Sequence, residues 1–200
     1  MILAEEFVLL ALDADGRVAQ GMSNQPAAAV GVTGALLTEL AQQGHVDLTD
    51  GRIRLAGSTP SHPLLASVLE NLVPHDGKKL KNRLGSVRHA GWSEVVDAMV
   101  ANGVLGREKH PLHPTRHPAS DPAAHQALIE EMRAAATGDD PLDARTATLL
   151  ALAGPCQMLE VVAPDRSDRP TAKRRIAEAA EQVPAAAAVK YVVDTVLAEG

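Results

Sequence analysis

Aromatic side chains are scarce in this chain, and that scarcity limits the folds that it can adopt. The 200 residues include one Trp, one Tyr and one Phe, although 46% of them are hydrophobic. A core of Leu, Val and Ala suits helices that pack closely and gives the broad faces of large sheets little to stack against. The sequence therefore predicts a mainly α fold: a single domain of amphipathic helices around a central apolar helix, with short β-hairpins.

Length and cysteine usage set the next limits. A chain of this size buries a sizeable core without cross-links, and we expect one domain over residues 1–200. The single cysteine, Cys156, excludes an intrachain disulfide, fits a reducing compartment and lies in an apolar run, so we predict an inert, buried thiol.

Targeting and membrane-spanning signals are missing from the sequence. No basic segment precedes an apolar stretch at the N-terminus, and no apolar run reaches the roughly 20 residues that cross a bilayer. We expect a cytoplasmic protein that associates with the inner face of the membrane only peripherally.

Apolar periodicity predicts most of the chain as helix. The predicted helices cover 1–12, 30–43, 63–72, 79–101, 122–136, 142–162, 171–182 and 185–197. Two hairpins are expected between them. The first surrounds the turn Asp50-Gly51, a strong hairpin signal, and the second covers 103–118 with a Pro- and His-rich tip.

A basic cluster occupies the start of the predicted helix 79–101. Its members are Lys78, Lys79, Lys81, Arg83 and Arg88, with His89 beside them. On a helix, Lys81, Arg88 and Trp92 would lie close to one face, and a helix start with Lys and Arg favours anions such as phosphate. The alternative is a solvated basic face with Trp92 half-buried in the core.

The other polar groups predict no catalytic or metal site. His110, His113 and His117 have a spacing that zinc or nickel ligands can have, but a proline directly follows each histidine and would break a helix that aligned them, which favours an exposed loop. Glu39, inside an apolar helix, is a candidate for a buried, paired acid. We find no acid–base pair, nucleophile elbow or phosphate loop, so we predict no enzyme, no cofactor and no metal.

Four segments, in order along the chain, carry a family resemblance. They are 3–12 followed by Gly16, 31–48 with its Gly31-x-x-Gly34 motif, 95–109, and 145–164 ending in Ala163-Pro164. Together they resemble the Golgi phosphoprotein 3 family over about half of the chain. The resemblance implies a mainly helical domain that binds phosphatidylinositol 4-phosphate in a shallow basic pocket, beside a hairpin that inserts apolar residues into the membrane. Eukaryotic members also bind the cytosolic tails of Golgi glycosyltransferases.

The resemblance also places the pocket residues. The family's Trp position falls near Asn24, its motif Arg at Thr33, and its two helix Arg positions at His89 and Trp92, with Arg88 one residue away. The complete set of candidate lipid-binding residues is Lys81, Arg83, Arg88, His89, Trp92, Thr33 and Asn24.

The sequence thus predicts a non-enzymatic peripheral module that binds anionic phospholipid headgroups. One alternative is a protein-interaction adaptor without lipid binding, because the family's Trp and Arg positions are changed. Another is a winged-helix-like nucleic-acid binder, because helix followed by hairpin occurs twice, at 30–55 and 80–118. The net charge of −6 argues against broad nucleic-acid binding. A homo-oligomer is a further possible assembly.

Overall fold

The computed structural model describes residues 1–19, 25–84, 91–110 and 113–198. Its helices are α1 Leu3–Ala11, α2 Gln25–Gln42, α3 Pro63–Leu72, α5 Trp92–Ala101, α6 Pro122–Thr137, α7 Ala144–Ala153, α8 Leu159–Val162, α9 Arg169–Gln182 and α10 Pro184–Ala198, with 3-10 turns η1 Val73–His75 and η2 Leu80–Asn82. The strands are β1 Val46–Asp47, β2 Arg54–Leu55, β3 Glu108–His110 and β4 His113–Arg116. The predicted mainly α fold with short hairpins is confirmed.

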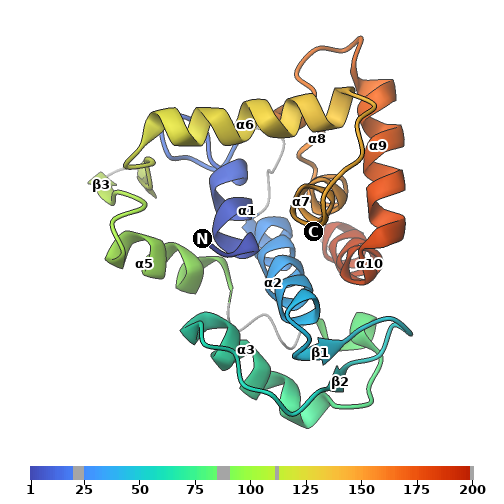
Figure 1. Cartoon of the computed structure of the whole chain (residues 1–200). Coiled ribbons are helices and arrows are strands. Elements are labelled where there is room, and N and C mark those ends of the chain that lie inside the picture. Colours follow the sequence, from blue (N-terminus) through green and yellow to red (C-terminus); the bar gives the residue numbers. More distant parts are fainter. Residues whose placement is uncertain (20–24, 85–90, 111–112, 199–200) are drawn as a thin grey trace.

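Buried apolar helices occupy the centre of the molecule. Every residue of α1 is buried, as are residues 146–153 of α7, and α2 packs against α1 and α10. Figure 1 shows α6 crossing one end of this centre, α9 and α10 along one side, α5 on the other side, and α3 with the β1–β2 hairpin at the opposite end. The core is therefore made by helices that approach closely, as the shortage of aromatic residues predicts.

The glycines of the Gly31-x-x-Gly34 motif allow this close approach. A Cβ at Gly31 would lie 2.4 Å from Cζ of Phe7 on α1, and one at Gly34 would lie 2.5 Å from Cγ2 of Val189 on α10. The predicted helix start at residue 30 is wrong, since α2 begins at Gln25 and carries both glycines inside it. The motif therefore provides a helix surface for close contact.

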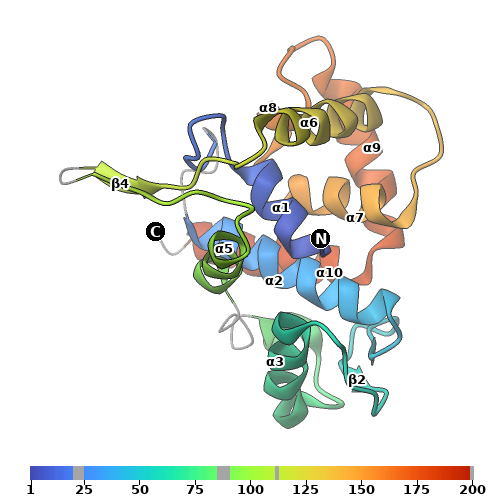
Figure 2. The same cartoon turned by 60° about the vertical axis from the view of Figure 1, so that its left-hand side comes forward.

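Both predicted hairpins are confirmed. β1 and β2 pair antiparallel with Val46 opposite Leu55, and Gly51 in the turn has a φ of +70°. β3 and β4 pair antiparallel with Glu108 opposite Arg116. Figure 2 shows the β3–β4 hairpin projecting well beyond the helical body.

The predicted long helix 79–101 is wrong. Lys79–Arg83 form the turn η2 and its flanks, and helix α5 begins only at Trp92, after Gly91 in an extended conformation. Residues 79–83 pair with the first hairpin instead of continuing a helix, because the Leu80 amide donates a hydrogen bond to the carbonyl oxygen of Gly51 at 2.9 Å. Lys81 and Trp92 therefore do not share a helix face.

The predicted helix 142–162 is also interrupted. Helix α7 ends at Ala153, and α8 begins at Leu159. Between them lie Gly154 and Pro155, both unfavourable to a continuing helix, and Gln157 with a left-handed φ of +62°.

Glu39 is paired, as the sequence suggested, although it is only half-buried. Its Oε2 accepts a hydrogen bond from the backbone N–H of Leu3 at 2.8 Å, and its Oε1 accepts one from Gln43. The carboxylate thus satisfies an otherwise unpaired donor at the positive end of α1. Its role is to join α2 to α1.

Candidate functional site

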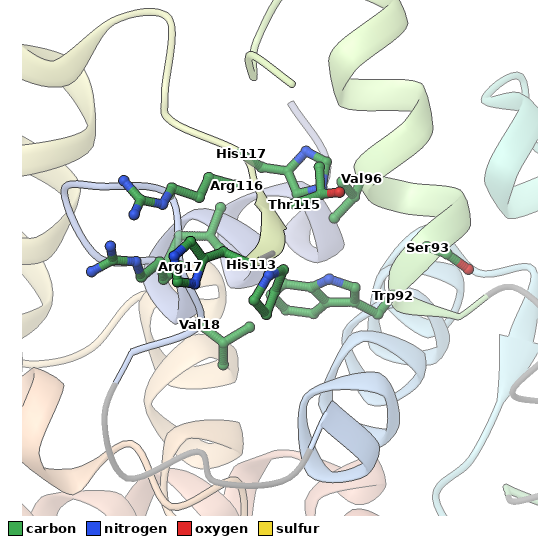
Figure 3. A pocket seen from close by; sticks show the side chains of 12 residues that line it. Arg17, Val18, Trp92, Ser93, Val96, His113, Thr115, Arg116 and His117 are labelled. Carbon is green, nitrogen blue, oxygen red and sulfur yellow. The ribbon is translucent and has the colours of Figure 1, made fainter. Parts of the chain in front are cut away.

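A pocket of about 810 Å³ opens between three segments that are far apart in the sequence. Its walls are residues 12 and 16–18 after α1, residues 92, 93 and 96 at the start of α5, and residues 113–117 of the second hairpin. Figure 3 shows the side chains that line it.

The first wall is a tight turn that places Arg17. The Asp13 carboxylate accepts hydrogen bonds from the backbone N–H groups of Asp15 and Arg17, each at 2.9 Å. Gly16 supplies the left-handed backbone that the turn needs, with a φ of +72°. After the turn, Val18 pairs antiparallel with Leu12, the residue that follows α1.

The second wall, the β3–β4 hairpin, is fixed to that turn through its backbone. The His117 amide donates to the Gly16 carbonyl oxygen at 2.8 Å, and the Gly106 amide donates to the carbonyl oxygen of Pro118 at 2.7 Å. The two chains approach so closely that a Cβ on Gly16 would lie 2.2 Å from the carbonyl carbon of His117. Residues 113–117 are therefore held at a fixed position over residues 16–18.

The third wall comes from the first turn of α5. Trp92 is half-buried and packs against the hydrophobic core, while Val96 is buried. In Figure 3 the indole of Trp92 lies on one side of the pocket, and Arg17 and Arg116 lie on the other side, with their guanidinium groups extending away from Trp92. The pocket thus combines an aromatic wall with a cationic one.

The ionisable side chains that line this pocket are all basic. They are Arg17, His113, Arg116 and His117. Arg17 makes an exposed ion pair with Asp15 at 3.3 Å, which contributes little because water screens both groups. Within the described ranges, the half-buried Arg116 has no carboxylate partner. A chain with a net charge of −6 therefore presents a locally cationic, aromatic-walled pocket that suits a phosphate-bearing ligand.

The structure separates the predicted site residues. Trp92 lines the pocket, whereas Lys81 and Arg83 are exposed at η2 and do not. Thr33 is 1% exposed and its hydroxyl donates to the carbonyl oxygen of Ala29, so it faces the helix core. The remaining predicted residues, Asn24, Arg88 and His89, lie outside the described residues.

Sequence reasoning missed Arg17 and Arg116 as a pair. They lie almost 100 positions apart and belong to a turn and a hairpin with no shared periodicity. The available signal is the concentration of His and Arg in residues 113–117 on an acidic chain, for which sequence reasoning predicts only an exposed loop.

Two kinds of reactive group can be assessed in the described residues: a metal-binding cluster and the thiol of Cys156. Within the part of the chain that the structure describes, no group of three His, Cys, Asp or Glu side chains is placed to hold a metal ion. Burial raises the pKa of the Cys156 thiol to about 12, and its Sγ lies 3.4 Å from the carbonyl oxygen of Ala27. Such a thiol is a poor nucleophile, as predicted.

The fold and the pocket define a class of protein: a mainly helical module with a cationic pocket beside a projecting hairpin. Over the described ranges, no helix has both the length and the hydropathy that crossing a bilayer requires. The sequence profile of the Golgi phosphoprotein 3 (GPP34) family matches residues 3–196, and the chain belongs to this family. A search of curated proteins finds no match.

Proposed function

We propose that this protein is a non-enzymatic peripheral module that binds the headgroup of an anionic phospholipid, of the phosphatidylinositol 4-phosphate type, in the pocket between Gly16, Trp92 and the β3–β4 hairpin. The observation that carries the proposal is the pairing of Arg17 and Arg116 with Trp92 around a pocket of about 810 Å³. Family membership supports it.

The chemistry of the lining fits a phosphorylated headgroup. Guanidinium groups bind phosphate oxygens through two parallel hydrogen bonds, and Arg116 has no carboxylate partner in the described chain to displace. The face of Trp92 offers an apolar surface to the ring of a sugar-like headgroup. His113 and His117 add donors at the edge of the pocket. The hairpin that supplies residues 113–117 of the lining projects beyond the helical body (Figure 2).

The test is binding of soluble inositol 1,4-bisphosphate by calorimetry, together with flotation of vesicles with and without phosphatidylinositol 4-phosphate. We expect Arg116→Gln and Trp92→Ala each to weaken headgroup binding by about tenfold or more, because each loses a direct contact. Arg166→Gln is the matched control, since Arg166 is an exposed cation on the α8–α9 loop, away from the pocket. Equal flotation with neutral and anionic vesicles, unchanged by Arg116→Gln, would refute the proposal.

A second candidate function, a protein-interaction adaptor, is supported by a different feature. A groove of about 620 Å³ lies between α9 and α10, and its floor includes the small or apolar side chains of Ala180, Ala187 and Ile176. Ala187→Arg would fill this groove without touching the cationic pocket. The adaptor would be favoured if the wild-type chain captures a protein that Ala187→Arg does not capture, and if the chain does not float with vesicles of any composition.

A salt-sensitive mobility shift with duplex DNA would favour the nucleic-acid alternative instead.

A further inference from the structure

A second cationic surface lies apart from the pocket. We call it the η2 surface; its members are Arg52, Lys78, Lys79, Lys81 and Arg83. All five side chains are exposed, and in the described residues none of them makes an ion pair. Elsewhere, Arg54, Arg107 and Arg174 do have carboxylate partners. Unpaired cations gathered on an acidic chain mark a surface for an anionic partner.

Backbone pairing holds the η2 surface in place. The Ile53 amide donates to the carbonyl oxygen of Lys78, and the Leu80 amide to that of Gly51, both at 2.9 Å. The Arg52 guanidinium donates to the carbonyl oxygen of Gly77 at 2.7 Å. The buried side chain of Leu80 then anchors the turn in the core. The backbone that carries these cations is therefore held in place by hydrogen bonds and by the burial of Leu80.

The carboxylates on the same hairpin are occupied locally. Asp50 pairs with Arg54, Asp47 accepts from Thr49, and Asp76 accepts from the Leu55 amide. Each of these three carboxylates therefore has a partner other than the cations of the η2 surface. Lys81 and Arg83 lie farther along the chain, at and after η2.

Lys81 is also paired with the only tyrosine. Its Nζ lies 5.3 Å from the centre of the Tyr191 ring, and Tyr191 on α10 is 51% exposed. An exposed aromatic ring beside an ammonium group is typical of residues at a membrane–water interface, where the ring meets the apolar boundary and the cation meets phosphates.

The elements that carry this pair contact each other, and one of them ends near the second hairpin. η2 packs against α10. Figure 2 shows the C-terminal end of α10 and the β3–β4 hairpin on the same side of the molecule. We therefore expect a bilayer that reaches the β3–β4 hairpin to approach also the end of α10 and the η2 turn that packs against this helix.

We propose that Lys81, Arg83 and Tyr191 form a second membrane contact that responds to the surface charge of the bilayer and not to the headgroup held in the pocket. This inference rests on the proposed peripheral function, and it divides binding into two parts. The pocket selects a headgroup, and the η2 surface adds electrostatic attraction that falls with increasing salt. Two such contacts together anchor a protein better than either does alone.

The experiment measures flotation of the full chain with phosphatidylcholine vesicles that contain increasing fractions of phosphatidylglycerol. We expect Lys81→Gln combined with Arg83→Gln to weaken binding by about tenfold, because each removes one attraction to the anionic surface. Tyr191→Ala should weaken it severalfold with little change in salt dependence. Affinity for soluble inositol 1,4-bisphosphate should stay at the wild-type value in all these variants.

The outcomes separate the two proposals. Flotation unchanged by Lys81→Gln with Arg83→Gln, or changed equally by the control Arg166→Gln, would overturn this inference while headgroup binding still stands. Absence of inositol 1,4-bisphosphate binding would refute the pocket alone. A salt-sensitive shift of duplex DNA that is lost in the double variant, without vesicle binding, would overturn the membrane assignment. Melting temperatures matching the wild type would show that the variants are folded, as expected for exposed side chains.

Discussion

The backbone N–H of His117 donates a hydrogen bond to the carbonyl oxygen of Gly16 across 2.8 Å. This contact joins the turn after α1 to the second hairpin and places Arg17 and Arg116 at the same pocket. Glycine is required at position 16 for two reasons: its backbone has a left-handed φ of +72°, and a side chain there would clash with the hairpin backbone. The shape of the cationic pocket therefore depends on a residue without a side chain.

The first prediction separates the effect of the left-handed φ at Gly16 from the effect of the close backbone contact. Gly51 has a similar φ of +70° but open space around it, so Gly51→Ala should cost only the backbone strain, about 1–2 kcal/mol of the free energy of unfolding. Gly16→Ala adds a clash with the His117 backbone and should cost distinctly more. Urea denaturation of both variants measures the difference. Equal losses would show that the turn and the hairpin are not in close contact.

A second prediction concerns Arg145, whose guanidinium bonds Glu6 on α1 at 2.8 Å and Glu131 on α6 at 2.6 Å. The Glu6 side chain is 10% exposed, whereas that of Glu131 is 48% exposed. Glu6→Ala should therefore cost about 2 kcal/mol, and Glu131→Ala less than about 1 kcal/mol, because water screens the outer pair. Chemical denaturation compares them, and a larger loss for Glu131→Ala would contradict this assignment.

The third prediction is a pH dependence that arises at the start of α7. The Asp143 carboxylate accepts a hydrogen bond from the Thr146 amide at 2.7 Å, and this bond holds the pKa of Asp143 below its ordinary value of 3.8. A lowered pKa in the folded state means stability that is complete above pH 3.8 and lost as the pH falls through the folded value. Asp143→Ala should cost about 1 kcal/mol near neutral pH, and the gap to wild type should shrink on acidification.

Asp143→Asn is the matched control for that experiment, because asparagine still accepts the capping hydrogen bond but does not titrate. We expect it to retain most of the stability near neutral pH. Urea denaturation of the wild type and both variants at a series of pH values gives the result. A gap for Asp143→Ala that does not shrink in acid would show that the carboxylate charge has no part in capping.

The fourth prediction concerns the reactivity of Cys156. Its thiol is buried, with a pKa raised to about 12 by desolvation, so almost no thiolate is present near neutral pH. The native protein should react with Ellman's reagent far more slowly than the urea-unfolded protein. Similar rates in both states would place Cys156 at an accessible surface and reopen its assignment as an inert thiol.

Local patterns in the sequence were good predictors of isolated elements. The turn Asp50-Gly51 predicted the first hairpin, and the predicted helix start at residue 122 agrees with α6. There the Asp121 carboxylate caps the helix by accepting hydrogen bonds from the amides of Ala123 and Ala124. Such signals are contained within a few neighbouring residues, and their hydrogen bonds close locally.

The prediction of helix 79–101 failed because its backbone forms hydrogen bonds with a segment that is distant in the sequence. Periodicity continued through 79–101, but the amide of Leu80 bonds to Gly51 instead of continuing a helix. The basic cluster that looked like one helix face was thereby divided, leaving Lys81 beside Tyr191 and Trp92 in the pocket. No pattern within a single segment records a contact with a residue far away in the sequence.

The sequence alone determined the helical class, the two hairpins, the inert cysteine and the resemblance to the Golgi phosphoprotein 3 family, because each depends on composition or short-range order. Only the tertiary structure decided which cations lie together. Arg17 and Arg116 meet because a glycine at position 16 lets two chain segments approach within hydrogen-bonding distance. Charge in a pocket is the sum of side chains that converge in space, and that convergence is fixed by packing.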